Sequence, residues 1–181
     1  MKAIATLIII FATLVAFSQT SLEKKVFEIV NEYRDSLGLQ ELKWDTVCQK
    51  AAGFQSTYLK STNGLLSHKN PNKGFETPSD RYKKAGGVVK KQEIKNEWTL
   101  SSSVGEIINE LNKSYKITEC LYEDKLAKEM FMIWKSSIEH NKAMTDPAAK
   151  FAGCSVVATE SPGNTKEWKH YNTISIMVLT N

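Results

Sequence analysis

The sequence predicts a single-domain, layered α/β fold of the α+β type, and two observations support it. Four stretches carry the apolar period of amphipathic helices, whereas two stretches with strand composition, 151–160 and 171–181, lie together in the last third of the chain. Strands that cluster late, instead of alternating with helices, do not build a doubly wound parallel sheet. No repeat or linker divides the chain, so we expect one domain over residues 20–181.

The first 19 residues are typical of a secretory signal peptide. Lys2 precedes an uncharged apolar run from Ala3 to Phe17, and the polar residues Ser18 and Gln19 follow it. This run is shorter than the roughly 20 residues that a membrane span needs, although an uncleaved N-terminal anchor is the alternative. We therefore predict a secreted protein, extracellular or periplasmic, with no stable membrane span after cleavage.

The first two helices have clear starting signals. Thr20 and Glu23 have the spacing of a capping box, and Gly38 suits the end of the helix that follows. Asp45 suits the N-cap of a second helix, which Asn63-Gly64 would end. The apolar positions on these two helices are Val26, Ile29, Val30, Tyr33 and Leu37, and then Val47, Ala51, Phe54 and Tyr58.

A polar loop, residues 61–77, carries His68 and leads into a short third helix. Thr77-Pro78-Ser79-Asp80 has the pattern of a helix start, and Gly86-Gly87 would end that helix. Residues 88–118 show no clear period, although Ser103 and Glu106 have the spacing of a capping box and predict a turn of helix.

One long helix is predicted from about Tyr122 towards Met144, and Asp146-Pro147 marks its exit. Ile174, Ile176 and Val178 then alternate along the last strand. The segment 161–164, Ser-Pro-Gly-Asn, suits a type II turn between the two strands, which predicts an antiparallel hairpin.

Charge and cysteine content narrow the class of protein. Lys and Arg total 24 against 20 Asp and Glu, a mild excess without the concentrated basic face that nucleic-acid binding requires, although lysines gather locally at 81–95. The three cysteines are Cys48, Cys120 and Cys154; an exported protein can form one disulfide from them, in any of three pairings, with one thiol left over. No C-x-x-C occurs, so a redox motif and a zinc knuckle are both excluded.

The side chains that could carry chemistry are few. His68, His140 and Glu106 each have an ordinary structural interpretation when taken alone. The sequence contains no H-E-x-x-H, G-x-S-x-G, P-loop or Rossmann glycine pattern. Ser67, Ser136 and Ser137 lie near histidines, but their spacing shows no base oriented by a third group. Spacing alone therefore predicts no specific reaction.

An ordered set of motifs resembles the CAP superfamily, which comprises the cysteine-rich secretory, antigen 5 and pathogenesis-related 1 proteins, and above all its small bacterial members. The similarity spans nearly the whole chain after the signal peptide, and the order of the motifs is more specific than any one of them. The motifs are IVNEYRDSLGLQELKWDTVCQKAA (29–52), LLSH (65–68), TPSDRYKKAGG (77–87), VGEII (104–108), WKSSIEHNKAM (134–144) and FAGCSVVA (151–158).

This resemblance implies an αβα sandwich, in which helices cover both faces of a small, mainly antiparallel sheet. It also implies a surface cleft to which His68, Glu106 and His140 contribute, with Ser137 where the family usually has a second glutamate. Two imidazoles and a carboxylate are competent ligands for zinc or another divalent cation. We therefore predict His68, His140 and Glu106 as metal ligands.

The resemblance and the residues together leave three functions open. The first is a non-catalytic extracellular binding module whose ligand is a lipid, a glycan or a protein. The second is a metal-dependent, peptidase-like hydrolase that uses the same cleft around an activated water. The third is a structural component of the cell surface. The sequence does not decide whether the protein is an enzyme, although the missing second glutamate weakens the case for catalysis.

Overall fold

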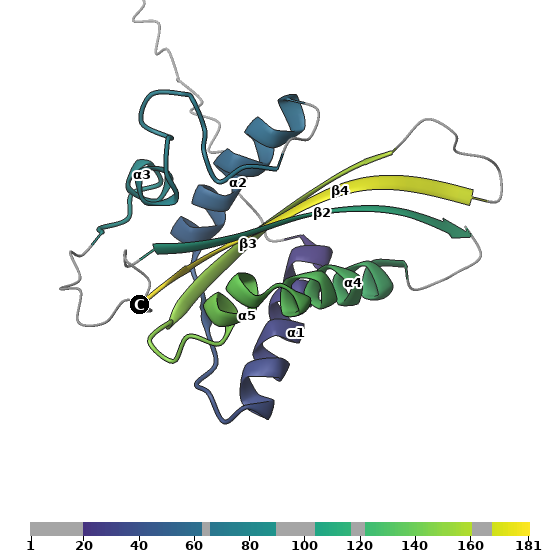
Figure 1. Ribbon diagram of the computed structural model, residues 1–181, viewed down its shortest axis with the longest axis horizontal. Helices are drawn as coiled ribbons and strands as arrows, with labels where there is room; N and C mark the ends of the chain where they lie inside the picture. The colour runs from purple at the N-terminus through teal and green to yellow at the C-terminus, as the bar shows by residue number, and fades with distance from the viewer. Residues whose placement is uncertain (1–19, 63–65, 90–103, 117–121, 161–167) are drawn as a thin grey trace, which may run out of the picture.

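The computed structural model describes residues 20–62, 66–89, 104–116, 122–160 and 168–181 (Figure 1). The predicted signal peptide, Cys120, Asn63-Gly64 and the predicted turn at 161–164 lie outside these ranges. The elements, in chain order, are α1 (Ser21–Ser36), β1 (Lys43–Trp44), α2 (Thr46–Ser61), α3 (Pro78–Lys84), β2 (Val104–Lys116), α4 (Tyr122–Ser136), α5 (Ile138–Met144), β3 (Phe151–Glu160) and β4 (Trp168–Thr180).

The four strands form one mixed sheet in the order β1-β3-β4-β2. β4 pairs antiparallel with β3 on one side and with β2 on the other, so the predicted hairpin of the last two strands is confirmed. The two-residue strand β1 pairs parallel with β3, with Lys43 opposite Phe151. β2 is therefore an edge strand, and it is on this edge that the candidate site lies.

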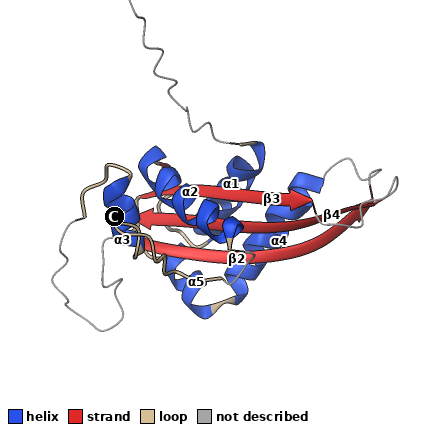
Figure 2. Cartoon of the chain, turned by 90° about the horizontal axis from the view of Figure 1, so that it is seen from above, coloured by secondary structure: helices blue, strands red, loops and turns tan. Residues whose placement is uncertain are grey.

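Helices cover both faces of the sheet, which confirms the predicted αβα sandwich (Figures 1 and 2). On one face, α1, α4 and α5 enclose a core around the fully buried Trp134. On the other face, α2 and α3 pack over a smaller core that includes Ile108 and Ile176. Since the sheet is covered on both sides, the side chains that point to either face of a strand are removed from water.

The predicted caps of the first three helices are confirmed. Thr20 and Glu23 form a capping box at α1, and Gly38 follows that helix with a φ of 70°, a backbone conformation that glycine adopts without steric cost. The carboxylate of Glu23 is 5% exposed and also accepts a hydrogen bond from the Val156 amide at 3.0 Å, which ties α1 to β3. Asp45 caps α2, and a second capping box begins α3.

The start of α2 lies directly against β3, because Gly153 provides no side chain there. A Cβ atom at Gly153 would stand 2.1 Å from the Gln49 amide nitrogen and 2.6 Å from the Asp45 carbonyl oxygen. Both contacts are with backbone, which cannot rotate away. This close approach sets the height of α2 above the sheet.

Arg34 joins the end of α1 to the segment that follows α5. Its side chain is fully buried, and its guanidinium donates to four backbone carbonyls. Burial lowers the pKa of Arg34, and the charge of Asp146 opposes that shift, but an arginine remains charged in any such setting. The four acceptors are the carbonyl oxygens of Gln40 (2.9 Å), Met144 (2.6 Å), Asp146 (3.0 Å) and Ala149 (3.3 Å).

The turn of helix predicted after Ser103 is wrong. Residues Val104–Lys116 form the strand β2, which pairs with β4 along its whole length. Its two faces are both buried, and two of its inward side chains are polar, namely Glu106 and Asn109. This mixture removes the simple alternation of apolar and polar residues by which a strand is recognised.

The single helix predicted from Tyr122 towards Met144 is two helices. Ser137 interrupts it with an extended backbone (φ −85°, ψ 122°), and its hydroxyl oxygen accepts from the His140 amide as the N-cap of α5. The apolar period continues across this break, which explains why the periodicity did not reveal it.

Cys48 and Cys154 are both free and buried, so the pairing of these two cysteines does not form. They lie in different cores, Cys154 on the α1 side of the sheet and Cys48 on the α2 side. Burial, together with the carboxylates of Asp45 and Glu23, raises the pKa of the two thiols well above its usual range. A buried neutral thiol is a poor nucleophile, which agrees with the absence of a redox motif.

Within the described ranges, none of the helices combines the length and the apolar character that crossing a bilayer requires.

Candidate functional site

The candidate site lies across the edge strand β2, where residues from both helical layers approach each other. Glu106 comes from β2 itself, His68 from the loop between α2 and α3, and His140 from α5. The two imidazole rings have their centroids 6.4 Å apart and their planes at 68°. The three residues predicted from separate parts of the sequence therefore lie together in this structure.

The carboxylate of Glu106 is fully buried and belongs to a buried ion pair. Nη2 of Arg81, whose side chain is also fully buried, lies 2.6 Å from each carboxylate oxygen. Oε2 of Glu106 is also 3.1 Å from Nδ1 of His68. A carboxylate without a counter-charge is costly to bury, and Arg81 supplies that counter-charge to Glu106 under the strand edge.

The position of His68 is fixed through its backbone as well as its ring. Nη2 of Arg81 donates to the His68 carbonyl at 3.1 Å. Gln55, on α2, donates to the carbonyls of Ser67 at 2.6 Å and Lys69 at 3.4 Å, on either side of His68. The His68 side chain is nevertheless 51% exposed, so one edge of its ring faces outward. The backbone of His68 is thus held on both sides, while its ring stays half-exposed.

The hydrogen bond to Glu106 determines which nitrogen of His68 is available. An ionised carboxylate can only accept, so the neutral imidazole must carry its proton on Nδ1. Nε2 then keeps its lone pair. The chain Arg81–Glu106–His68 therefore presents an acceptor nitrogen on the exposed side of the ring.

His140 faces His68 from the other layer and is half-buried. Burial lowers its pKa, the neighbouring charge of His68 lowers it further, and Glu139 partly opposes both. The ring is therefore neutral at neutral pH. Its Nδ1 atom is buried and has no hydrogen-bond partner among the described residues, which is a costly state that a bound polar group would relieve.

Ser137 lies near the site but serves the helix. Its hydroxyl oxygen is 3.5 Å from the backbone amide of His140, where it caps α5 and thereby orients the turn that carries the histidine. No hydrogen bond from this hydroxyl to an imidazole nitrogen occurs among the described residues, so the geometry of an activated serine is not present there.

The predicted metal ligands fit an ion only in part. Both oxygens of Glu106 are engaged by Arg81, so the carboxylate is not available as a third ligand in this arrangement. Two rings sharing one tetrahedral zinc ion would have centroids about 5 Å apart, closer than the 6.4 Å between His68 and His140. Among the described residues no group of three His, Cys, Asp or Glu side chains could hold a metal ion. The two imidazoles are the donors that remain.

Arg81 is the functional residue that sequence reasoning missed. It lies within the motif TPSDRYKKAGG but 25 positions before Glu106, in a cluster of basic residues that resembles a solvated helix end. One available signal was its place on a short helix between two motifs that each supply a site residue. A buried carboxylate at Glu106 would have required such a cation.

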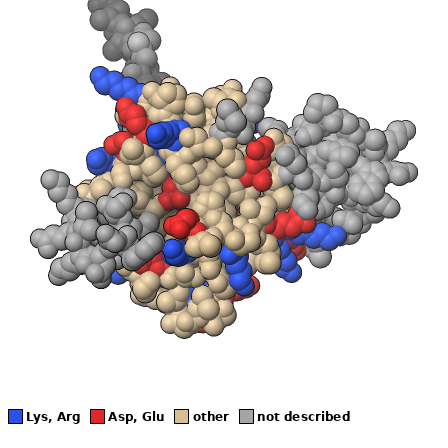
Figure 3. All heavy atoms as spheres, viewed as in Figure 1, with Lys and Arg blue, Asp and Glu red and all other residues tan. Residues whose placement is uncertain are grey.

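The described charges on one face of the molecule are intermixed. On the face shown in Figure 3, the described acidic and basic side chains are interspersed instead of gathered by sign. A ligand is therefore not drawn to this face by a large field of one sign, and its selection depends on local contacts.

Comparison with known proteins gives one family. The model of the cysteine-rich secretory protein family, CAP, matches residues 27–174. No curated protein matches the sequence.

Solved structures share the fold at low sequence identity. An outer surface protein of Borrelia burgdorferi is 15% identical with a TM-score of 0.53, over 91% of this chain and 96% of that one. A cysteine-rich secretory protein of Staphylococcus aureus is 12% identical with a TM-score of 0.52, over 92% of this chain and 40% of that one. An extracellular protein of Bacillus anthracis containing an SCP domain is 18% identical with a TM-score of 0.49, over 84% and 40%. This chain thus spans well under half of the last two proteins.

Proposed function

Because the chain belongs to the cysteine-rich secretory protein (CAP) family, we propose that it is an extracellular, non-catalytic binding domain. Its ligand-binding element is the cleft between His68 and His140, which holds a polar group of an extracellular ligand. One solved structure with a similar fold is described as an outer surface protein, which supports the location.

The observation that carries the proposal is the hydrogen-bonded chain from Arg81 through Glu106 to His68. Arg81 and Glu106, both buried, orient the ring of His68. The other nitrogen of that ring is left free to accept a hydrogen bond. His140 supplies the opposite wall with a neutral ring. Such a pair binds a hydroxyl or amide group without any reacting atom being supplied by the protein.

A hydrolase would need more than this pair provides. Glu106 is engaged by Arg81 and cannot move to activate a water without breaking a buried ion pair. Ser137 caps a helix instead of contacting an imidazole nitrogen. Among the described residues that meet at β2, the site has an orienting carboxylate and two imidazoles, without a serine hydroxyl positioned as a nucleophile.

Zinc provides the first test of the cleft, because two imidazoles can bind a cation weakly even without Glu106. We expect isothermal titration of zinc into the exported protein to give weak binding that is lost in the His68→Ala/His140→Ala variant. The matched control is His170→Ala: this third histidine is opposite Ser114, eight residues along β2 from Glu106, and its loss should not change the binding. Equal heats from the wild type and the double variant would show that His68 and His140 do not bind zinc.

The same three proteins separate binding from hydrolysis. Incubated with a peptide library, with and without a chelator, the wild type should cleave no more than His68→Ala/His140→Ala does. Chelator-sensitive cleavage that the double variant loses and His170→Ala keeps would instead establish a metal-dependent hydrolase, and the non-catalytic proposal would be withdrawn.

A further inference from the structure

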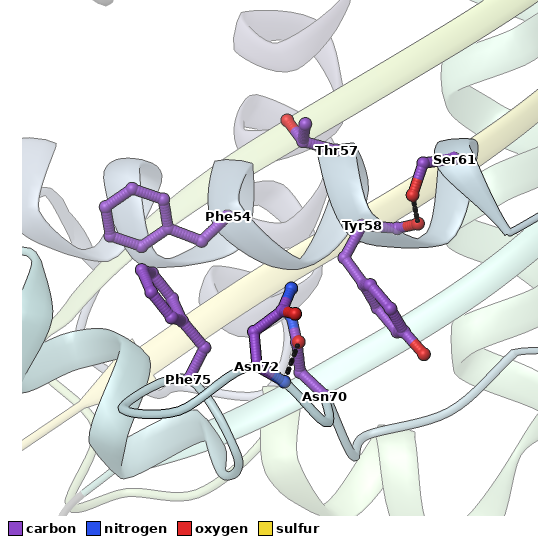
Figure 4. A pocket seen from close by; sticks show the side chains of 7 residues that line it. All are labelled: Phe54, Thr57, Tyr58, Ser61, Asn70, Asn72 and Phe75. Carbon is purple, nitrogen blue, oxygen red and sulfur yellow. Dashed lines mark hydrogen bonds between the residues drawn. The ribbon is translucent and has the colours of Figure 1, made fainter.

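A pocket lies between α2 and the loop that carries His68. It opens between α2 and residues 70–75 and has a volume of about 310 Å³ (Figure 4). Figure 4 shows Tyr58 on one side of Asn70 and Asn72, and the rings of Phe54 and Phe75 on the other. Nothing in the proposed role of the cleft uses these side chains.

Aromatic rings from two separate elements make the apolar wall of this pocket. The rings of Phe54, on α2, and Phe75, in the loop, meet edge to face with their centroids 5.0 Å apart. Nζ of Lys84 lies 5.6 Å from the centroid of Phe75. Contacts of this kind hold the rings in place, so the wall is formed before any ligand arrives.

The floor of the pocket is polar and rigid. Asn70 is 3% exposed; its amide donates to Gln55 Oε1 at 3.3 Å, and its side-chain oxygen accepts from the Asn72 backbone amide at 3.0 Å. By contrast, the side-chain amide of Asn72 and the hydroxyls of Thr57 and Tyr58 have no hydrogen-bond partner among the described residues. These three groups are therefore available to a ligand.

The lining selects a small, neutral ligand. None of the described residues that line the pocket is charged, so a phosphate, a carboxylate or an ammonium group would lose its hydration without gaining a counter-charge from them. The volume is at the lower end of the range for ligand pockets, roughly 300–1,000 Å³, which suits one ring better than an extended chain. A ligand that matches the aromatic wall and the polar groups has an apolar face for the phenylalanines and hydrogen-bonding groups at its edge.

We propose that this pocket binds one neutral pyranose unit of an extracellular glycan, with preference for an acetamido sugar. The axial C–H face of a pyranose packs on the Phe54–Phe75 wall, and its hydroxyls reach Thr57 and Tyr58. The amide of Asn72 pairs with the acetamido group. The proposal does not depend on the histidine cleft, although Gln55 holds both Asn70 and the backbone beside His68 and so links the two.

The test uses the uniformly ¹⁵N-labelled exported chain and three probes: diacetylchitobiose, cellobiose and laurate below its micelle concentration. Diacetylchitobiose should shift the amide resonances of residues 70–75 and of α2, with a dissociation constant on the order of 1 mM, since an open pocket and a one-ring contact recover little free energy. Cellobiose should bind about tenfold more weakly, because it has no acetamido group to pair with the Asn72 amide.

Variants locate the binding. Phe75→Ala should weaken the binding of diacetylchitobiose at least tenfold. Asn72→Ala changes an exposed loop residue and leaves the core intact; it should remove the preference for diacetylchitobiose over cellobiose. Phe151→Ala alters another partly exposed phenylalanine, on β3, and His68→Ala alters the cleft; both should bind like the wild type. No response to either sugar, shifts caused by laurate alone, or a Phe75→Ala variant that binds normally would each overturn the proposal. Sugar binding lost in His68→Ala would assign the ligand to the cleft instead.

Discussion

Replacing Arg81 by methionine should lower the free energy of unfolding by about 3–5 kcal/mol. The change leaves the Glu106 carboxylate fully buried without the cation that lies 2.6 Å from both of its oxygens. It also removes the donors to the carbonyls of Phe75 and His68, on which the shape of the loop depends. Urea denaturation of the wild type and the variant measures the difference.

Two further variants show whether the ion pair is the cause. Lys83→Met is the matched control, because Lys83 is on the same helix with its side chain 58% exposed, and we expect a change within about 0.5 kcal/mol. Combining Arg81→Met with Glu106→Gln removes the stranded charge, so the double variant should be at least about 1 kcal/mol more stable than the sum of the single effects implies. Additive single effects, or an Arg81→Met cost as small as that of Lys83→Met, would contradict the buried pair.

Replacing Arg34 by methionine should be at least as damaging, with a loss of about 4 kcal/mol or more. Four carbonyl oxygens accept hydrogen bonds from this one guanidinium, those of Gln40, of Met144 at the end of α5, and of Asp146 and Ala149 after it. Without it, the carbonyls of Met144 and Ala149 lose a donor in buried contacts, and the end of α1 loses its attachment to the segment around the end of α5.

The lysine variant distinguishes shape from charge. Arg34→Lys keeps the positive charge, but a single ammonium cannot reach acceptors that a planar guanidinium contacts along different directions. We expect it to recover less than half of the lost stability in thermal unfolding. Lys24→Met, on the exposed side of α1, is the control and should leave the melting temperature unchanged. An Arg34→Lys protein as stable as the wild type would show that charge alone suffices.

The helix starts were predictable because each is determined by neighbouring residues. Thr20 with Glu23, Asp45, and Thr77 with Asp80 all satisfy amides within three positions of themselves, so the sequence alone contains both partners. The late hairpin was predictable for the same reason, since its strands have strong composition and lie close in sequence.

The edge strand β2 was not predictable from its own residues. Glu106 points into the protein because Arg81 neutralises it, and the Asn109 amide is buried because it donates to the Met130 carbonyl at 3.2 Å. Each partner is more than 20 positions away. Local pattern therefore predicted a capping box where the fold has a buried ion pair.

The candidate site was found through the order of its motifs and not through its chemistry. The resemblance indicated that His68, Glu106 and His140 converge, and in the structure they lie together. It could not show that Glu106 already has both oxygens engaged by Arg81, nor that Ser137 breaks the helix before His140. Those facts depend on three-dimensional contacts, and they change the expected role of the glutamate from metal ligand to orienting group.

The central claim is that Arg81 and Glu106 hold His68 with its proton on Nδ1 and its Nε2 free. Long-range ¹H–¹⁵N correlation of the imidazole nitrogens at a mildly alkaline pH tests this directly. The His68→Ala variant assigns the signals, and the Glu106→Gln variant should lose the preference because an amide can also donate. We expect a protonated Nδ1 and a bare Nε2 for His68; a proton on Nε2 with Nδ1 bare would contradict the account.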